Sequence, residues 1–546
     1  MKRSLKHFKS YFSLLALLIL VSYCQELYAH VQANKIFIDN MVLQRNKSNT
    51  IFGTADSEKE VRILFKNKQY NSNVINGNWS VNIDPSDAGG PYTLEIQGDN
   101  KITIKNILVG DVWLCSGQSN MYSRIKDLKN NFPDLAAPYL NTYKNKNIRF
   151  FTLNIHASSI EKKEIEPSSF NRNGWKEINP ETVLECSSVA FFYAKKIQEE
   201  TGIPIGLIIS TKGGTRAECW VKDKVLSSKP LYKPILDTFQ KNLIGYEEKF
   251  AKYCRDTAVW MKSHDFKGMK YESIHSSKRK GGPKEPMGSN HIKRPSGLYN
   301  AMIAPLSQIS IKGVIWYQGE SNTWNIDMVK RYTSLFPDLI KQWRNAWGYD
   351  FPFYFVQLAA HKIPQKSPID ETWPFMREAQ TRALQLPKTG MAVITDKGYI
   401  FDIHPPFKAE AGERLALQAL KNTYGQNIVA SGPIFKNYKV KNKEVILSFK
   451  NFGKGLESRT ITLDTIPLDE SNLQGFSICD ENHNWVWAKA EIISKNKVKI
   501  WNEEIEHPVA VRFAWANFPI FNLFNSEGLP ALPFRTDTFE YVSTKK

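Results

Sequence analysis

The feature that most constrains this chain is a set of short segments made almost entirely of apolar residues. They occupy residues 107–115, 203–210, 311–318, 351–359 and 390–396. Apolar runs of this length are typical of strands that are buried on both faces of a parallel sheet. Segments with helical periodicity lie between them, so strand and helix alternate along the chain. This alternation predicts an α/β fold in which helices cover both faces of a parallel sheet.

Glycine and proline residues indicate where two of these helices end and where a third is interrupted. The helix expected at 189–202 stops at Gly202, and the helix expected at 408–425 closes at Gly425, because glycine readily adopts the conformation that follows a helix. Pro337 falls inside a third periodic segment. Proline lacks a backbone donor, so we expect Pro337 either to start a second helix or to kink the first.

The residues before this region have the pattern of an all-β module. Asn76 and Gly77 form a dipeptide that is typical of a tight hairpin turn. Trp79, Val81 and Ile83 then alternate with polar residues, which indicates a strand with one buried face. We therefore expect a small sandwich-like module here.

Short alternating segments return after Gly425 and predict a second β module. They include residues 444–449, 497–501 and 509–515, and no helical periodicity separates them. The patterns together divide the chain into a leader, a β module, an α/β domain and a second β module, expected at residues 1–29, 30–106, 107–425 and 426–546.

The leader has the composition of an export signal. Lys2 and Arg3 precede an apolar run that starts at residue 11 and is too short to span a bilayer. Ala29 offers a small residue for cleavage. Cys24 follows the run as a lipid-anchored cysteine would, but bulky Tyr23 stands where such signals need a small residue. We expect a periplasmic or extracellular protein without a membrane span, and anchoring through Cys24 is the less favoured alternative.

The charge of the chain is strongly positive, at +19. Such an excess is a feature of proteins that bind polyanions. Here the lysines are scattered, and the one dense basic patch, at residues 276–297, is rich in Gly, Pro and Ser, which indicates a solvated loop. For an exported protein we expect no nucleic-acid partner, and an anionic glycan is the more plausible acidic ligand.

Polar residues follow four of the apolar segments. Their positions are Gly117-Gln118-Ser119-Asn120, residues 211–215 (Thr-Lys-Gly-Gly-Thr), residues 319–322 (Gly-Glu-Ser-Asn), and Asp402 with His404. Ligands bind beyond the carboxyl ends of the strands in an open α/β sheet. Each group taken alone is an ordinary turn or helix cap. Taken together, they supply a nucleophile, oxyanion donors, a base and an orienting carboxylate, which acyl transfer needs.

The histidines give no indication of a metal site. All ten are scattered without the HExxH pattern or a paired spacing. Acyl transfer by a serine needs no Lewis acid, so we expect neither a catalytic metal nor a cofactor.

Several unusual sequence blocks, taken in order, resemble one known family. The blocks are IFIDNMVLQR, AGGPYTLEI, GDVWLCSGQSNM, GLIISTKGGTRAECW, IKGVIWYQGESN, FPFYFVQLA, REAQTRALQLP and DIHPPFKAEAGERLAL. They are similar to blocks of the sialate O-acetylesterase family of SGNH-type (GDSL-like) hydrolases, and they cover most of the mature chain. The resemblance implies a flavodoxin-like parallel sheet flanked by β modules.

The resemblance also implies roles for individual residues. Ser119 corresponds to the nucleophile, His404 to the base and Asp402 to the orienting acid. The backbone N–H groups of Ser119 and Gly214 would form part of the oxyanion hole, and an amide side chain completes it in the wider superfamily.

Two departures from the superfamily pattern leave alternatives open. Either Gln318 or Asn322 can supply the amide of the oxyanion hole, and we favour Gln318. Phe401 occupies the position three residues before the histidine, where the superfamily has its aspartate. A dyad in which a backbone carbonyl assists His404 is therefore an alternative to a triad with Asp402.

The remaining candidates are side chains expected to contact substrate, namely Gln118, Asn120, Arg216, Glu320, Asn322 and His361. His361 also follows a strand and is the rival base. Glu320 is equally well interpreted as the structural partner of Arg377 or Arg216. Arg216 is the candidate to bind the carboxylate of an acidic sugar.

The function predicted from these residues is that of a secreted carbohydrate O-acetylesterase, which releases acetate through a serine acyl-enzyme. Sialic acid acetylated at its 9-position is the substrate that the resemblance implies. Acetylated plant polysaccharide, xylan or xyloglucan, is the alternative. A glycan-binding protein with an inactive site is the alternative of another class, and the presence of both Ser119 and His404 argues against it.

Overall fold

The computed structural model describes residues 31–56, 60–140, 142–171, 174–264, 266 and 281–542. The expected leader, with Cys24 and Ala29, lies outside the described residues, and so do residues 276–280 of the basic patch. Within the described part, no helix has the length and apolar character that crossing a membrane requires.

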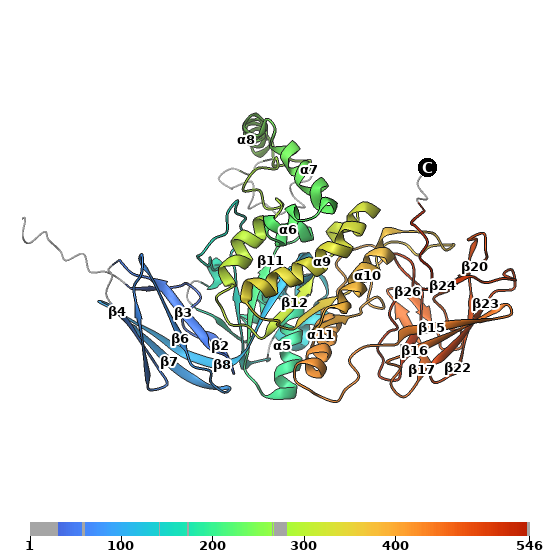
Figure 1. Ribbon diagram of the computed structural model, residues 1–546, viewed down its shortest axis with the longest axis horizontal. Helices are drawn as coiled ribbons and strands as arrows, with labels where there is room; N and C mark the ends of the chain where they lie inside the picture. The colour runs from blue at the N-terminus through green and yellow to red at the C-terminus, as the bar shows by residue number, and fades with distance from the viewer. Residues whose placement is uncertain are drawn as a thin grey trace, which may run out of the picture.

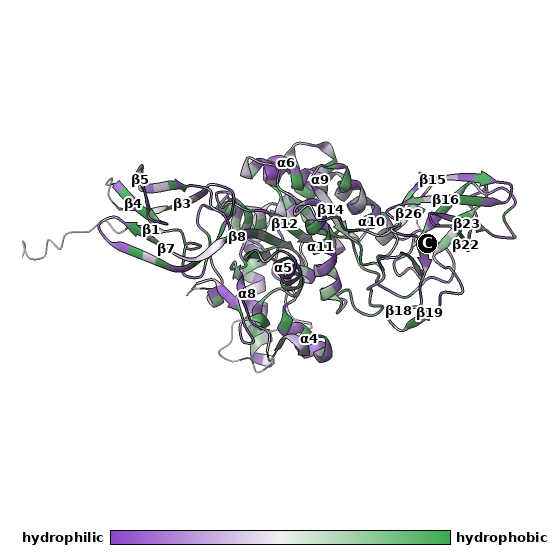
Figure 2. Cartoon of the chain, turned by 90° about the horizontal axis from the view of Figure 1, so that it is seen from below, coloured by the Kyte–Doolittle hydropathy of each residue, from purple (hydrophilic) through white to green (hydrophobic). Residues whose placement is uncertain are grey.

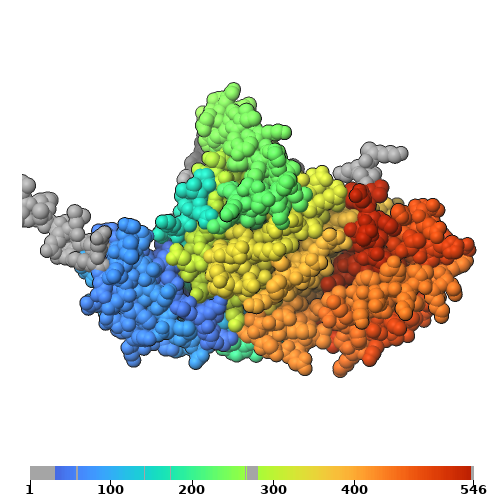
Figure 3. Space-filling view, viewed as in Figure 1, coloured from blue at the N-terminus to red at the C-terminus, as the bar shows by residue number. Residues whose placement is uncertain are grey.

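Three regions follow one another along the long axis of the molecule (Figure 1). A β region lies at the N-terminal end, a mixed α/β region in the centre and a second β region at the C-terminal end. Helices α7 (Lys233–Leu243) and α8 (Tyr246–Ser263) stand above the central region as a projection, which the space-filling view shows clearly (Figure 3).

The central region contains seven strands of a mixed sheet in the order β10-β9-β11-β8-β12-β13-β14. Their bounds are β8 Lys101–Gly117, β9 Asn145–Thr152, β10 Lys176–Ile178, β11 Ile205–Thr211, β12 Gly313–Tyr317, β13 Phe353–Val356 and β14 Thr389–Ala392. Neighbouring strands from β9 to β14 are parallel, and β10 is antiparallel to β9. The predicted α/β class is confirmed.

Helices pack on both faces of this sheet. On one face lie α5 (Ser188–Thr201) and α11 (Lys408–Asn422), where Trp113 of β8 meets Tyr193 of α5 edge to face. On the other face lies α9 (Ile326–Trp347), where Trp316 of β12 meets Trp343. Helix α10 (Thr372–Arg382) packs against α9. Gly412 lets α11 approach α5, because a Cβ there would lie 2.6 Å from the Val189 carbonyl oxygen.

The predicted helix ends are correct to within a few residues. Gly202 caps α5 with a φ of 70°, as expected. Helix α11 ends at Asn422, and Gly425, with a φ of 74°, lies three residues beyond it. Pro337 lies inside α9, which continues without interruption, so the expectation of a second helix starting at this proline is wrong.

The N-terminal region consists of two facing sets of strands. One is β1-β3-β6, and the other joins β5, β4, β7 and β8, with β2 beside β8. The bounds are β1 Gln32–Ala33, β2 Val42–Gln44, β3 Asn49–Thr54, β4 Glu60–Phe65, β5 Lys68–Asn73, β6 Asn78–Ile83 and β7 Gly89–Gln97. Trp79, Val81 and Ile83 are buried on one face of β6, as predicted. Asn76 and Gly77 both have positive φ, as a two-residue hairpin turn needs.

Strand β8 connects this region with the central one. It pairs with β7 over its first half and with β11 and β12 over its second half. The boundary expected between residues 106 and 107 therefore falls inside a single strand of 17 residues. The position of Gly117, where β8 ends, therefore depends on strand pairing in both the N-terminal and the central region.

The C-terminal region contains two four-stranded sheets, β15-β16-β23-β22 and β21-β20-β24-β26, and the pairs β17-β25 and β18-β19. The bounds are β15 Ile434–Lys441, β16 Glu444–Lys450, β17 Leu456–Ser458, β18 Ile461–Leu463, β19 Ile466–Leu468, β20 Phe476–Cys479, β21 Trp485–Trp487, β22 Lys489–Ser494, β23 Lys497–Trp501, β24 Ala510–Phe513, β25 Leu523–Asn525 and β26 Phe534–Arg535. Hydrophobic and hydrophilic residues alternate along strands of this region (Figure 2).

The C-terminal region is fixed to the central one through a buried arginine. Arg377 of α10 donates to the carbonyl oxygens of Ala516 and Asn517 at 2.7 and 2.8 Å. The backbone N–H of His361 donates to the same Asn517 carbonyl at 3.1 Å. The loops at this end of the sheet therefore rest on the second β region.

Candidate active site

The candidate nucleophile lies on a tight turn where β8 ends. Gly117 has a φ of 138°, and a Cβ at this position would lie 2.1 Å from the carbonyl oxygen of Tyr317. Only glycine is compatible with both conditions. The next residue, Gln118, donates its backbone N–H to the same oxygen at 2.9 Å. The short helix α2 (Ser119–Tyr122) then begins, and Ser119 stands at the carboxyl edge of the sheet between β11 and β12.

The structure brings Ser119, His404 and Asp402 together. His404 Nε2 lies 2.9 Å from Ser119 Oγ, and His404 Nδ1 lies 2.8 Å from Asp402 Oδ1. The same carboxylate oxygen accepts the backbone N–H of His404 at 2.9 Å. Asp402 therefore reaches the imidazole from a position two residues before it, although the superfamily uses the position three residues before.

The Gly213-Gly214 turn that follows β11 packs against the nucleophile. A Cβ on Gly213 would lie 3.4 Å from Ser119 Cβ, and Gly214 has a φ of 69°. The turn therefore brings a backbone without side chains next to the serine. The oxyanion role expected for the N–H groups of Ser119 and Gly214 stays a prediction.

The side-chain amide of Gln318 makes its contacts within the protein. Its Nε2 donates to the Thr215 carbonyl oxygen at 3.2 Å and to Asn322 Oδ1 at 2.8 Å. Both amide hydrogens are therefore engaged within the protein, and a role for Gln318 at the oxyanion stays a prediction. Asn322 is also engaged, because its Nδ2 donates to Glu218 Oε2 at 2.9 Å and its Oδ1 accepts the Ala217 N–H at 3.0 Å.

Gln118 braces the neighbouring loop. Its buried Oε1 accepts the backbone N–H of Ser321 at 3.3 Å and that of Gly319 at 3.5 Å. The loop after β12 is thus held to the turn that carries the nucleophile. The structure thus gives Gln118 an internal role, and its contact with substrate stays a prediction.

Asn120 and Glu320 form part of a buried network. Asn120 Nδ2 donates to Glu320 Oε1, and Asn120 Oδ1 accepts from Lys408 Nζ. Burial raises the pKa of Glu320 above its usual value. Glu320 thus contacts Asn120, so the expectation of an ion pair with Arg377 or Arg216 is wrong.

Lys408 was not identified from the sequence. Burial is the main cause that lowers its pKa, from 10.5 to about 7, against the attraction of Glu320 and Asp402. Lysine at a helix start is usually a solvated residue. The only signal in the sequence was its position four residues after His404, inside a block that resembled the family.

His361 contacts the loop that precedes Asp402. Its Nδ1 is 3.3 Å from the carbonyl oxygen of Tyr399, and its ring packs against Trp373. Burial lowers the pKa of His361, and this favours the neutral ring. The imidazole that contacts Ser119 belongs to His404.

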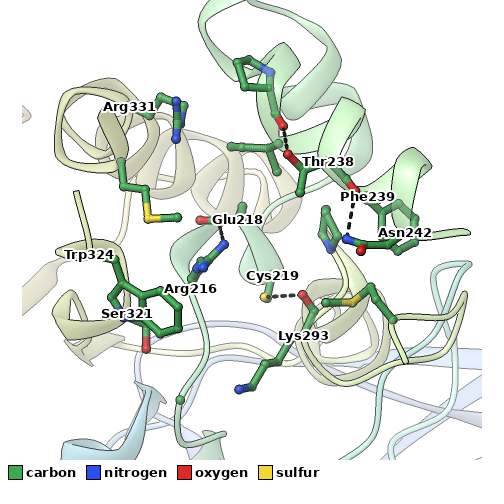
Figure 4. A pocket seen from close by; sticks show the side chains of 16 residues that line it. Arg216, Glu218, Cys219, Thr238, Phe239, Asn242, Lys293, Ser321, Trp324 and Arg331 are labelled. Atoms are coloured by element: carbon green, nitrogen blue, oxygen red, sulfur yellow. Dashed lines mark hydrogen bonds and ion pairs between the residues drawn. The ribbon is translucent and has the colours of Figure 1, made fainter. Parts of the chain in front are cut away.

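A cavity of about 370 Å³ lies beside the turns that follow β11 and β12, and Ser119 is not among its lining residues (Figure 4). Its walls come from the turns after β11 and β12, from α7 and α9, and from the described part of the basic patch. The lining residues are Gly214, Arg216, Glu218, Cys219, Pro234, Ile235, Thr238, Phe239, Asn242, Met287, Lys293, Pro295, Ser321, Trp324, Met328 and Arg331.

The cavity carries more positive than negative charge. Arg216, Lys293 and Arg331 line it, and Glu218 is the one carboxylate among its lining residues. Arg216 lies 3.8 Å from Glu218, and its guanidinium stacks on Trp324 at 5.1 Å from the ring centroid. Figure 4 shows Arg216 between these two residues, with Lys293 and Arg331 on opposite sides. Sequence reasoning identified Arg216 alone.

Among the described residues, no group of three or more His, Cys, Asp or Glu side chains is arranged to hold a metal ion.

The comparison with protein families identifies the group to which this site belongs. The profile of a family described as carbohydrate esterase, sialic acid-specific acetylesterase, matches residues 109–249 and 285–420, which is just over half of the chain. The chain belongs to this family. The profile includes the turn of Ser119 and the loop of His404, and it omits residues 250–284, where most of α8 lies.

Individual relatives agree with this assignment over nearly the whole chain. The sialate O-acetylesterase of Mus musculus is 28% identical over 556 residues, which cover 91% of this chain and 93% of the mouse protein. The Homo sapiens sialate O-acetylesterase is 26% identical, with 91% of each chain covered. A solved structure, a novel carbohydrate acetylesterase from Xanthomonas citri, is 30% identical, has a TM-score of 0.74, and covers 93% of this chain and all of its own.

These findings confirm the family resemblance expected from the sequence. The chain is a carbohydrate esterase, and its activity is that of a carboxylic ester hydrolase. The long relatives also match the flanking β regions, so the three-region architecture is not peculiar to this chain.

Proposed function

We propose that this esterase is exported and removes O-acetyl groups from sialic acids through a serine acyl-enzyme. The observation that carries the proposal is the 2.9 Å contact between Ser119 Oγ and His404 Nε2, with Asp402 on the other ring nitrogen. Neutral imidazole that donates Nδ1–H to Asp402 presents a free lone pair at Nε2 to the hydroxyl.

The reaction proceeds in two steps. Ser119 Oγ forms a bond to the acetyl carbon while His404 takes the hydroxyl proton, and the sugar oxygen leaves with that proton as the ester bond breaks. A water molecule then loses a proton to His404 and attacks the acetyl group. Acetate is released, the proton returns to Ser119 and the enzyme is restored.

Backbone N–H groups stabilise the oxyanion in both steps. The donors are those of Ser119 and Gly214, supported by the contact of the Gly213-Gly214 turn with the serine. Because the Gln318 amide is engaged elsewhere, the hole consists of backbone donors. Each donor of this kind typically contributes about 3 kcal/mol to stabilisation of the transition state.

The cavity lined by Gly214, which follows the glycine that packs against Ser119, receives the sugar. Trp324 is 75% exposed and offers a flat apolar face, which is suited to the C–H face of a sugar ring. Arg216, Lys293 and Arg331 supply the positive charge that the carboxylate of a sialic acid needs. Neutral acetylated polysaccharide has no group for these cations, and this favours the acidic sugar.

The arrangement of the sheet supports an SGNH-type catalytic domain. The six parallel strands β9-β11-β8-β12-β13-β14 have the chain order 2-3-1-4-5-6. Without β9, which lies outside β11, the other five have the order 2-1-3-4-5 of a flavodoxin-like sheet. Its switch point lies at β8, where Ser119 follows the strand. The basic leader with its apolar run supports export.

The substrate is tested with a panel of acetylated sugars. Purified protein is supplied with O-acetylated sialosides and with acetyl-xylan oligosaccharides, and released acetate is measured. We expect kcat/KM to be at least tenfold higher for the sialosides. Equal or higher kcat/KM values for acetyl-xylan would instead favour an acetylesterase that acts on polysaccharide.

The mechanism is tested with Ser119→Ala. Hydrolysis of p-nitrophenyl acetate should fall about a thousandfold or more, and circular dichroism should be unchanged. Retained turnover in a folded variant would show that another nucleophile acts.

A further inference from the structure

Asn120 connects the two segments that carry the reacting groups. It follows Ser119 in α2, and its Nδ2 donates to the carbonyl oxygen of Ile403, the residue before His404, at 3.1 Å. The same amide nitrogen donates to Glu320 Oε1 in the loop after β12. The amide oxygen accepts from Lys408 Nζ in the first turn of α11. One side chain thus joins four segments around the nucleophile.

This network is buried, in contrast to the reacting groups above it. Lys408, Asn120 and Glu320 are 2%, 1% and 3% exposed. Ser119 is only half-buried, and the side chains of His404 and Asp402 are 45% and 54% exposed. Charges inside a protein interact strongly and are costly when unpaired, so Lys408 and Glu320 depend on each other.

We propose that Lys408 is a positioning residue for ester hydrolysis, which holds Asn120 so that Ser119 and the His404 loop keep their relative positions. The inference rests on the proposed serine mechanism. Lys408 donates to the amide oxygen of Asn120, and Glu320 accepts from its amide nitrogen, so the Asn120 amide is fixed in one orientation. In that orientation its remaining contact, to the Ile403 carbonyl, sets the position of the loop that presents the imidazole.

The network also acts on the imidazole through charge. Glu320 interacts electrostatically with His404 as well as with Lys408, and Lys408 is attracted by Glu320 and Asp402. A buried carboxylate stabilises the imidazolium that forms during each step of the reaction. Below a pH of about 7, where Lys408 holds its proton, its ammonium offsets the cost of keeping that carboxylate ionised in the interior.

The test substitutes Lys408→Met and compares it with Lys421→Met, an exposed lysine on the same helix. For Lys408→Met we expect kcat for p-nitrophenyl acetate to fall at least tenfold with KM changed less than twofold. The rate at which diisopropyl fluorophosphate modifies Ser119 should fall in parallel, because it depends on the same alignment. Lys421→Met should match the wild type.

A second variant separates a coupled network from independent effects. In a Glu320→Gln background, Lys408→Met should cost less than threefold, because no buried charge then loses its partner. Additive losses would show that Lys408 and Glu320 act independently, and Lys408 would then be a purely structural residue.

The outcomes are distinguishable from failure of the proposed mechanism. If the reagent does not label Ser119 in the wild type, the serine mechanism is wrong. If it does, and folded Lys408→Met keeps kcat within threefold, the positioning role is wrong. If Lys408→Met does not fold, Asn120→Ala removes the amide that joins the segments without changing a charge. The kcat of Asn120→Ala must then fall at least tenfold for the inference to stand.

Discussion

Two carboxyl groups interact with His404, and they lie in opposite surroundings. Asp402 is half exposed and contacts the ring directly at 2.8 Å. Glu320 is buried and acts through the Asn120 network. Water screens the charge of the first, so its main contribution is to orient the ring and fix its tautomer. The second contributes its charge, because little water surrounds it.

The difference indicates how this site departs from a triad with a buried aspartate. Orientation and charge stabilisation, which one residue supplies there, are divided between two. Asp402 comes from the same loop as His404, whereas Glu320 lies in the short 3₁₀ helix Glu320–Asn322 that follows β12. The contributions of Asp402 and Glu320 to the action of His404 can therefore be measured separately.

The largest effect should come from removing the ring on which both carboxyl groups act. His404→Ala should lower turnover of p-nitrophenyl acetate about a thousandfold or more, close to the loss in Ser119→Ala, because members of a triad act as a unit. His361→Ala is the matched control and should stay within about tenfold of the wild type, since its ring contacts Tyr399. A dead His361→Ala beside an active His404→Ala would reverse the assignment of the base.

The next effect compares the two carboxyl groups directly. Asp402→Asn should lower kcat about a hundredfold, which is less than for a buried triad aspartate, because the exposed site lets water replace part of the contact. Glu320→Gln should lower kcat about tenfold. Rates are measured as pH profiles on the same ester. A larger loss for Glu320→Gln would make the buried carboxyl group the principal partner of the base.

The burial of Lys408 should also change how the stability of the protein depends on pH. The pKa of Lys408 is lowered from 10.5 to about 7 in the folded protein. Between these two values the unfolded chain holds a proton that the folded chain has lost, so the free energy of unfolding should rise with pH. Chemical denaturation of the wild type, compared with Lys408→Met from pH 7 to pH 10, measures the difference. A wild type that loses stability relative to the variant over this range would contradict the lowered pKa.

The smallest effect concerns the exposed charges of the cavity. Raising salt from about 0.05 to 0.5 M should raise KM for an acetylated sialoside several-fold and leave KM for neutral acetyl-xylose almost unchanged, because screening acts on the charged contact. Arg331→Met should abolish most of the difference. Equal salt dependence for the two substrates would remove the electrostatic argument for an acidic sugar.

The sequence was informative where topology alone brings residues together. Ser119 and the Gly213-Gly214 turn follow neighbouring parallel strands, whose carboxyl ends must meet at one edge. His404 follows β14 through a longer loop, and the family blocks identified it. The turn at Asn76-Gly77 was predictable because only a few residue types adopt positive φ. It joins β5 and β6, which belong to different sheets and do not form the expected hairpin.

The sequence was uninformative where a side chain's partner comes from a loop. The partners of Gln318 are Thr215 and Asn322, and no periodicity reveals that the three lie together. Lys408 was missed because burial of a lysine depends on an acceptor supplied by another segment. Trp324 was missed because a single aromatic residue in a loop belongs to no sequence pattern. Its role as a cavity wall depends on α7 and α9, which complete the cavity.

The central claim is that Ser119 carries the acetyl group between the two steps. The most direct measurement mixes the enzyme with p-nitrophenyl acetate at low pH, quenches within milliseconds, and maps the acetylated peptide by mass spectrometry. The account predicts acetyl on the peptide that contains Ser119, at up to one group per chain, and none in Ser119→Ala. Acetyl on any other residue that forms and decays at the rate of turnover would contradict it.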